Sequence, residues 1–248
     1  MSRKARKQNC NKYRKQKGGD YLRVIQGGAL QRQRHKEVNI VPRNFNQDDL
    51  LGLLEDKNIN IVFATGPAGT GKTFISTLAG IKGLKNNKLD KFVVTRPAVS
   101  VDEQHGFLPG TLQEKMAPWT RPIMDVFEEY YSPDQIEYML NDNKIEVAPL
   151  AYMRGRTFKN SYIIADEMQN ATDNQMKMLL TRIGENSKLV VTGDLAQHER
   201  GYDSNGLKCF IERLTKLGSD RIKMVQFTNG DIERHPVVTE VLRLYNEA

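Results

Sequence analysis

The segment from Gly66 to Thr73, with the sequence GPAGTGKT, constrains the fold more than any other part of the chain. It fits the pattern G-x-x-x-x-G-K-[ST], in which glycines allow a tight turn that points backbone N–H groups inward. An apolar run of strand length precedes it at 60–65, and a helical pattern follows it at 74–84. We therefore expect a strand, a phosphate-binding loop and a helix, with a glycine-rich structural turn as the alternative.

Each part of this loop has a defined task if it binds a nucleoside triphosphate with Mg²⁺. The backbone N–H groups and the start of the following helix would hold phosphate oxygens. Lys72 would bridge the β- and γ-phosphates, and the Thr73 hydroxyl would ligate Mg²⁺. The predicted nucleotide-binding residues are Gly66, Pro67, Ala68, Gly69, Thr70, Gly71, Lys72 and Thr73.

Two carboxylates follow a second buried-type strand, which is expected at 161–165. Asp166, at the end of this strand, would hold Mg²⁺ together with Thr73, and Glu167 would act as general base on the attacking water. An adjacent Asp-Glu pair is also common on protein surfaces, which is the alternative interpretation. The position of Glu167 argues against a metabolite kinase, because such an enzyme need not activate water.

A third strand, expected at 188–192, is followed by Gly193, Asp194 and Gln197. Gln197 would sense the γ-phosphate; alternatively, Asp194 caps a helix at this turn. Gln47, before the first strand, would bond the edge of an adenine ring or would lie exposed at a helix start. Hydrolysis also needs a cation against the charge of the transition state, and the candidates are Arg96, Arg154, Arg156, Arg182, Arg200 and Arg234.

Strands and helices alternate along the chain, which predicts a single α/β domain with a mainly parallel sheet covered on both faces. The other strands are expected at 91–95, 144–147 and 223–227, and the other helices after an Asx cap at 46–49, at 174–183 and at 237–245. The segment 98–143 contains four prolines and is interpreted as an elaboration inserted into the sheet scaffold.

The positive charge of the chain is concentrated near its N-terminus. Residues 1–36 carry twelve Lys or Arg and one acid, a net charge of +11, whereas the 25 basic and 29 acidic residues that follow give −4. Such blocks bind nucleic acid because each neutralised phosphate releases counterions. We therefore expect a flexible basic arm that contacts RNA or single-stranded DNA, with a solvated tail that has no specific partner as the alternative.

The remaining composition restricts the environment of the chain. No apolar run approaches the roughly 18 residues that a membrane span needs, and no apolar stretch follows the basic N-terminus as it would in a secretory signal. The two cysteines, Cys10 and Cys209, have no metal-binding spacing and are expected to be reduced thiols. A cytoplasmic protein without a membrane partner is the resulting expectation.

The order of these motifs resembles the PhoH-like ATPases, from Pro42 nearly to the C-terminus. Beyond the phosphate loop, the matching segments are VTRP at 94–97, GFLPG at 106–110, APLAYMRGR at 148–156, IADEMQ at 164–169, TGDLAQ at 192–197 and DIERHP at 231–236. The resemblance implies a RecA-like three-layer sandwich related to the ATPase half of superfamily 1 helicases. In that layout, the strands before Asp166 and Gln197 lie beside the strand of the phosphate loop.

The resemblance also implies roles for individual residues. By motif position, Arg234 looks like an arginine that reaches the γ-phosphate of a neighbouring subunit, and Gln47 looks like the residue that reads adenine. Arg96, Arg154 and Arg156 look like contacts to nucleic acid or to a neighbouring subunit. A role in RNA metabolism and a ring-shaped homo-oligomer, such as a hexamer, are implied as well. No nuclease activity is expected, because the basic arm stands where some members carry a nuclease domain.

Together these inferences lead to a Mg²⁺-dependent ATPase coupled to the binding or remodelling of RNA or DNA. Residues 1–36 would be the arm and residues 37–248 the ATPase domain. Unwinding would need a neighbouring subunit, because superfamily 1 helicases use two RecA-like halves and this chain supplies one. Two alternatives stay open. One is a nucleotide-gated regulator that binds nucleic acid or protein, hydrolyses ATP slowly and does not unwind; the other is a small-molecule phosphotransferase.

Overall fold

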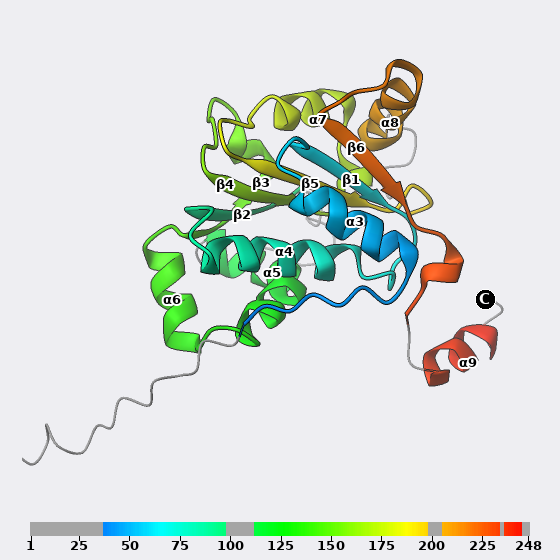
Figure 1. The fold of residues 1–248 in the computed structure, drawn as a ribbon, viewed down its shortest axis with the longest axis horizontal. Coiled ribbons are helices and arrows are strands. Elements are labelled where there is room, and N and C mark those ends of the chain that lie inside the picture. The colour runs from blue at the N-terminus through cyan, green and yellow to red at the C-terminus, as the bar shows by residue number, and fades with distance from the viewer. Residues whose placement is uncertain (1–36, 98–111, 198–204, 234–235, 245–248) are drawn as a thin grey trace, which may run out of the picture. The chain divides into compact units, whose positions relative to one another are not determined.

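The computed structural model describes residues 37–97, 112–197, 205–233 and 236–244. The basic arm expected at 1–36 lies outside the described residues, as do Arg200 and Arg234. Within 37–248, the described residues form a central sheet with helices on both of its faces (Figure 1). None of the described helices is long and apolar enough to cross a membrane.

The sheet contains six strands in the order β3-β2-β4-β5-β1-β6. Each neighbouring pair is parallel, so the described strands all end at the same edge. Most of them are short apolar runs, as is typical of a parallel sheet that is buried on both faces. The strands are β1 (Ile61–Thr65), β2 (Lys91–Arg96), β3 (Ile145–Pro149), β4 (Ser161–Ala165), β5 (Lys188–Gly193) and β6 (Ile222–Gln226).

Helices occupy the described segments between and beyond the strands. The α-helices are α3 (Phe45–Glu55), α4 (Lys72–Lys85), α5 (Leu112–Glu128), α6 (Pro133–Asn141), α7 (Asp173–Leu180), α8 (Gly206–Leu217) and α9 (Pro236–Leu244) among the described residues. Short 3₁₀ helices of the same part of the chain include η2 (Leu150–Met153), η3 (Met168–Asn170) and η4 (Asn229–Asp231).

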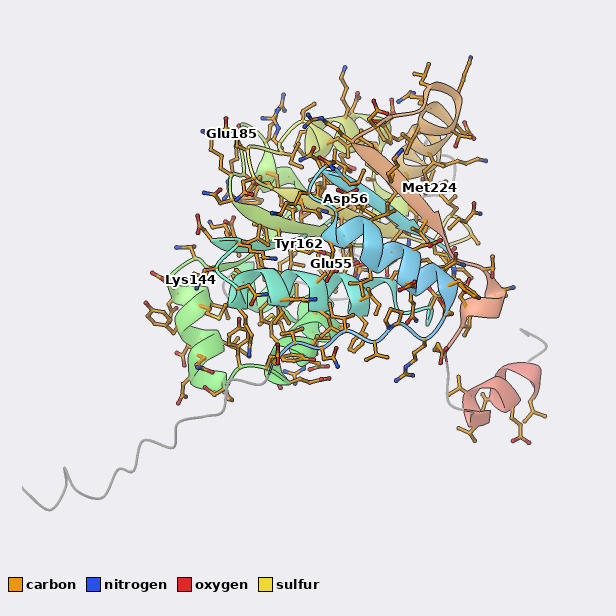
Figure 2. The ribbon with its side chains drawn as sticks, in the orientation of Figure 1. Glu55, Asp56, Lys144, Tyr162, Glu185 and Met224 are labelled. Atoms are coloured by element: carbon orange, nitrogen blue, oxygen red, sulfur yellow. The ribbon has the colours of Figure 1, made fainter. Side chains whose placement is uncertain are left out.

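Two hydrophobic cores lie on opposite faces of the sheet, because successive side chains of a strand point to opposite sides. In β1, Val62 and Ala64 belong to the core that α3, α4, α5 and α6 cover. Ile61 and Phe63 belong to the second core, which α7 and α8 cover. Tyr162 of β4 lies inside the first core (Figure 2). The expected RecA-like three-layer sandwich is thus confirmed (Figure 1).

The six expected strands are present, with bounds within two residues of the expected ranges. The prediction that the strands before Asp166 and Gln197 both lie beside β1 was wrong for the first of them. β5, which precedes Gln197, pairs with β1, but β4, which precedes Asp166, pairs with β2 and β5 instead. The reason is that β5, whose residues 189–193 are all buried, takes the central place between them.

The segment 98–143 is more regular than its prolines suggested. Within its described part, α5 continues through Pro118 and Pro122, although proline removes a backbone donor from a helix. The helix persists because Ile123, Val126 and Phe127 are buried in the first core. Burial of this apolar stripe outweighs the lost hydrogen bonds.

Helix caps explain two further differences from the expected elements. α6 begins with a capping box between Ser132 and Gln135, and Pro133 lies in its first turn, where proline is favoured. α3 begins one residue before the expected Asx cluster, because the side chain of Asn44 caps it by accepting from the Gln47 N–H at 2.9 Å. Helix α8 was not expected at all.

Candidate nucleotide-binding site

The glycine-rich loop lies at the carboxyl edge of the sheet, between β1 and α4 (Figure 1). Gly71 has a φ of +81° and leads directly into α4, a conformation that costs glycine little. Gly66 has a φ of +134°, and a Cβ there would lie 2.4 Å from the carbonyl oxygen of Phe227. Both positions therefore need glycine. Gly71 needs it for its backbone angle, and Gly66 needs it both for its backbone angle and for close packing against the chain after β6.

Lys72 lies inside this loop with only 8% of its surface exposed. Its ammonium group donates to the carbonyl oxygens of Gly66 at 2.7 Å and Pro67 at 2.5 Å, and to the Thr70 hydroxyl at 3.2 Å. Burial lowers the pKa of Lys72, and the nearby carboxylates of Asp194, Asp166 and Glu167 oppose this shift. The lysine thus places a buried positive charge between the loop and the acids at the ends of two other strands.

Thr73 and Asp166 meet across the edge of the sheet although they are 93 residues apart in sequence. The Thr73 hydroxyl donates to Asp166 Oδ1 at 3.2 Å, and the Thr192 hydroxyl at the end of β5 donates to the same oxygen. The backbone N–H of Asp166 donates to the Thr95 carbonyl at 2.9 Å, which extends the β2–β4 ladder by one bond. The predicted pair of metal ligands is therefore brought together.

These two side chains fit a magnesium ion. Mg²⁺ prefers hard oxygen donors and commonly takes one or two of them from the protein, with phosphate and water completing its shell. The described residues contain no group of three or more His, Cys, Asp or Glu that could hold a metal ion on its own. A hydroxyl and a carboxylate beside a phosphate loop correspond to this mode of binding.

Glu167 follows Asp166 in a left-handed backbone conformation, with a φ of +54°. Residues other than glycine adopt this region seldom, and such positions cluster at functional sites. Its carboxylate oxygen Oε2 accepts a hydrogen bond from the amide of Gln169 at 2.6 Å. Gln169 itself is buried and was given no role from the sequence, although it lies in the IADEMQ segment.

The turn after β5 contains Asp194 and Gln197. Asp194 Oδ1 accepts from the Ala196 N–H at 3.0 Å, and its carbonyl oxygen accepts from the Gln197 N–H at 3.2 Å. Asp194 therefore stabilises a turn, as the alternative interpretation held, although the described part of this turn contains no helix. Gln197 has an exposed side chain at the edge where β1 also ends.

Gln47 is buried against the phosphate loop, with 3% of its surface exposed. Its side-chain Nε2 donates to the Thr70 carbonyl at 3.0 Å, and Oε1 accepts from the Arg43 N–H at 2.9 Å. The alternative of an exposed helix start is therefore wrong. In this structure Gln47 supports the loop, and its contact with adenine stays a prediction.

The chain after β6 also reaches the phosphate loop, which the sequence did not suggest. The Phe227 N–H donates to the Thr65 carbonyl at 2.7 Å, and the Glu233 N–H donates to the Gly69 carbonyl at 2.9 Å. Asp231 anchors this segment to α3 by accepting from Asn46 Nδ2 at 2.7 Å. Arg234, the next residue after Glu233, lies outside the described residues.

The other candidate arginines have different surroundings. The Arg96 guanidinium lies over the Trp119 ring, 6.0 Å from its centroid, and Arg154 is exposed after η2. Arg182 donates to the carbonyl oxygens of Met178 at 3.2 Å and Arg156 at 3.3 Å, so it stabilises the connection around it. The contact roles predicted for Arg96 and Arg154 stay predictions, as does the candidate cation role of Arg182.

Arg156 is part of an ion network at the outer strands. Its Nη2 donates to Glu146 Oε2 at 2.8 Å, its Nη1 bonds Oε1, and its guanidinium lies 4.5 Å from the centroid of the Phe158 ring. Lys91 donates to the same carboxylate at 2.9 Å. The Arg156 hydrogen bonds, helped by Lys91, lower the pKa of Glu146 from its ordinary 4.5 to about 2.

The family of the chain follows from its match to a family model described as PhoH-like protein, which covers residues 39–246. The chain belongs to the PhoH-like family. A PhoH-like protein of Synechocystis is 38% identical over 91% of this chain and 67% of its own length. A PhoH-like protein of Bacillus subtilis is 44% identical over 77% and 60%, and Protein PhoH of Escherichia coli is 41% identical over 84% and 58%. The chain thus spans about three fifths to two thirds of the length of these relatives.

Two solved structures with distant similarity to this PhoH-like chain are an ATPase core and a helicase. The SWI2/SNF2 ATPase core of Sulfolobus solfataricus in complex with double-stranded DNA has a TM-score of 0.45 at 14% identity, covering 79% of this chain and 48% of that one. The Pif1 helicase of Candida albicans has a TM-score of 0.41 at 15% identity, covering 84% and 44%. Similarity at this level says nothing about activity.

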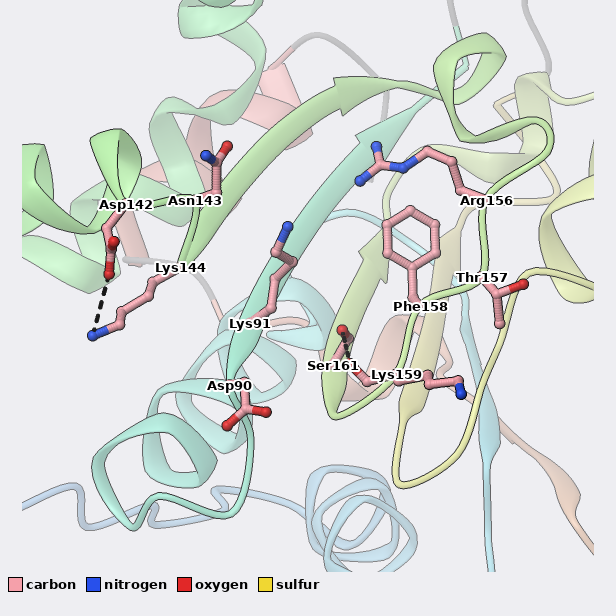
Figure 3. A pocket seen from close by; sticks show the side chains of 10 residues that line it. All are labelled: Asp90, Lys91, Asp142, Asn143, Lys144, Arg156, Thr157, Phe158, Lys159 and Ser161. Atoms are coloured by element: carbon pink, nitrogen blue, oxygen red, sulfur yellow. Dashed lines mark hydrogen bonds and ion pairs between the residues drawn. The ribbon is translucent and has the colours of Figure 1, made fainter.

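A pocket of about 470 Å³ is lined by residues that do not belong to the candidate nucleotide site (Figure 3). It is at the opposite edge of the sheet, because Lys91 and Ser161, which line it, begin β2 and β4. Two of the basic side chains that line the pocket form ion pairs within the chain. Lys144 pairs with Asp142 at 3.5 Å, and Arg156 pairs with Glu146. The pocket is therefore not part of the candidate nucleotide site.

Proposed function

We propose that this PhoH-like chain binds ATP with Mg²⁺, hydrolyses it, and couples hydrolysis to RNA or single-stranded DNA. The observation that carries the proposal is the hydrogen bond between Thr73 and Asp166. It joins the phosphate loop to a strand that ends in two carboxylates, with the Lys72 ammonium held beside them. A glycine-rich structural turn would have no need of this constellation.

The reaction divides among the residues as follows. The loop from Gly66 to Thr73 holds the phosphates with its N–H groups, and Lys72 neutralises charge on the β- and γ-phosphates. Glu167 takes a proton from the attacking water, whose oxygen bonds to the γ-phosphorus as the bond to the bridging oxygen of ADP breaks. Gln197 lies in the turn after β5, from where it responds to the γ-phosphate.

Thr73 and Asp166 would hold the Mg²⁺ ion. When bound, Mg²⁺ withdraws charge from the phosphate oxygens and so stabilises the transition state. Arg234 supplies the remaining cation, from its own or a neighbouring subunit. A homo-oligomeric ring is part of the proposal, because a single RecA-like core provides only one wall of a site that superfamily 1 helicases build from two.

Residues 1–36 form the arm that contacts nucleic acid in this proposal, and residues 37–248 form the ATPase domain. The support is the net charge of +11 on the arm, against −4 on the residues that follow. Charge of this density binds phosphates without sequence preference and weakens with salt. Arg96 at the end of β2 and Arg154 after η2 are further candidates for contact with nucleic acid. Arg156 is also a candidate, although it already bonds Glu146 within the chain.

The test is steady-state ATP turnover with and without single-stranded RNA. Three proteins are compared: the full chain, a chain that lacks residues 1–36, and a matched full-length control in which the twelve Lys and Arg of the arm are replaced by Gln. We expect RNA to stimulate the full chain, and both altered chains to lose the stimulation while keeping basal turnover. If RNA did not change the turnover of any of the three proteins, the proposed coupling would be contradicted and a nucleotide-gated regulator would be the remaining function. If none of them hydrolysed ATP, the proposed ATPase activity would be contradicted.

A further inference from the structure

Gln169 uses both ends of its side-chain amide to connect two parts of the site. Its Nε2 donates to Glu167 Oε2 at 2.6 Å, and its Oε1 accepts from the backbone N–H of Asp194 at 3.1 Å. The amide orientation is dictated by these partners, because a reversed amide would set oxygen against a carboxylate and NH₂ against an N–H. Gln169 therefore holds the carboxylate after β4 and the turn after β5 at the same time.

The surroundings of Gln169 leave this amide little freedom. Its side chain is 1% exposed, in η3 directly after Glu167. A Cβ at Gly193 would lie 2.8 Å from Gln169 Oε1 and 3.2 Å from its backbone nitrogen. Glycine at 193 therefore lets the end of β5 approach the amide closely. Hydrogen bonds to a charged group are strong when they are shielded from water, so this link is stiff.

We propose that Gln169 is a positioning residue, which sets the carboxylate of Glu167 for proton abstraction and locks it to the Asp194–Gln197 turn. This inference rests on the proposed hydrolysis. It adds that the general base and the turn that carries Gln197 move as one unit, because a single buried amide bonds both. Removing the amide leaves the phosphate loop and its lysine intact, so binding of ATP is retained while turnover falls.

Two substitutions separate the two hydrogen bonds. Gln169→Met keeps the length and volume of the side chain and loses both bonds. Gln169→Glu keeps an acceptor for the Asp194 N–H but sets a second negative charge against Glu167. We expect kcat to fall about 10- to 100-fold in each, as for a misplaced catalytic group. The dissociation constant of a non-hydrolysable ATP analogue, measured with Mg²⁺, is expected to stay within about threefold, which is less than 1 kcal/mol.

The matched control is Gln175→Met. Gln175 lies six positions further along, in the capping box of α7, where its side-chain Oε1 accepts from the Thr172 N–H at 3.0 Å and its backbone N–H donates to the Thr172 hydroxyl at 3.3 Å. The substitution removes the first of these bonds and keeps the second. It should lower the melting temperature and leave kcat unchanged. If Gln169→Met fails to fold, Gln169→Glu decides the question.

A double-mutant cycle that combines Gln169→Met with Glu167→Gln distinguishes a positioning role of Gln169 from a merely structural one. Because Gln169 acts in part through Glu167, Gln169→Met should lower kcat clearly less in the Glu167→Gln background than in the wild type, and any loss that remains there measures its hold on the Asp194–Gln197 turn. Normal kcat in both Gln169 variants would overturn the inference, as would additive losses in the cycle or a joint loss of binding and turnover. The wild type is measured alongside: if it does not hydrolyse ATP, the proposed function fails, whereas an active wild type with unaffected Gln169 variants overturns only the positioning role.

Discussion

At the scale of single residues, Glu167 occupies a strained position that its neighbours hold in place. A left-handed backbone costs a non-glycine residue about 1–3 kcal/mol, and it persists only where the surroundings impose it. Here the Glu167 carbonyl accepts from the Asn170 N–H at 3.1 Å, and buried Met168 anchors the turn. In this conformation the Glu167 carboxylate accepts from the Gln169 amide at 2.6 Å.

Replacing Glu167 by Gln tests the role of this carboxylate. The amide keeps the shape of the side chain and an oxygen for the Gln169 hydrogen bond, but it cannot take a proton from water. We expect ATP to bind with nearly unchanged affinity and kcat to fall by about 10²- to 10⁴-fold, the usual contribution of a general base. Calorimetry with ATP and a phosphate-release assay measure the two effects.

Lys72→Ala is the comparison for this experiment. It removes the buried ammonium from the loop, so binding itself should be lost. If Glu167→Gln also abolished binding, Glu167 would be a structural residue and not the base.

At the scale of elements, an ion network fastens the outer strands of the sheet. Glu146 of β3 accepts from Lys91 at the start of β2 and from Arg156 in the connection to β4. β3 is one of the two edge strands of the described sheet, so it has a neighbouring strand on one side only. The network therefore fixes a strand that backbone hydrogen bonds hold from a single side.

This network predicts how stability depends on pH. Because the folded pKa of Glu146 is lowered to about 2 from 4.5, the unfolded chain binds more protons between these values. The stabilisation by Glu146 is complete above pH 4.5 and is lost as the pH falls towards 2. Glu146→Gln should cost about 1 kcal/mol at neutral pH, allowing for solvent screening, and the difference from wild type should shrink in acid. Urea denaturation at several pH values measures it, and a constant difference would refute the prediction.

At the scale of the whole molecule, the described residues form one sheet with one candidate nucleotide site at its carboxyl edge. The segment after β6 folds back onto that site, where the Glu233 N–H bonds the Gly69 carbonyl of the same chain. Arg234 follows directly in sequence. The proposed ring would place this arginine at the contact between two subunits, each of which has its own nucleotide site.

Mixing two inactive variants tests this arrangement. Arg234→Ala lacks the arginine but has the base, and Glu167→Gln lacks the base but has the arginine. If the arginine acts between subunits, a mixed oligomer regains part of the activity, because some sites combine Glu167 of one subunit with Arg234 of the next. We expect such a partial recovery in turnover as the mixing ratio is varied. No recovery at any ratio would mean that Arg234 serves the loop of its own chain.

The sequence by itself determined the features that depend on consecutive residues. Apolar runs of strand length located the six strands, and the spacing from Gly66 to Lys72 located the loop. The tertiary structure alone decided the features that depend on strand order and side-chain contact. It put β5 between β1 and β4, buried Gln47 against Thr70, and set the Gln169 amide between Glu167 and Asp194. These contacts join residues from different elements, and no local pattern encodes them, because they arise only when the register of the sheet brings the ends of its strands together.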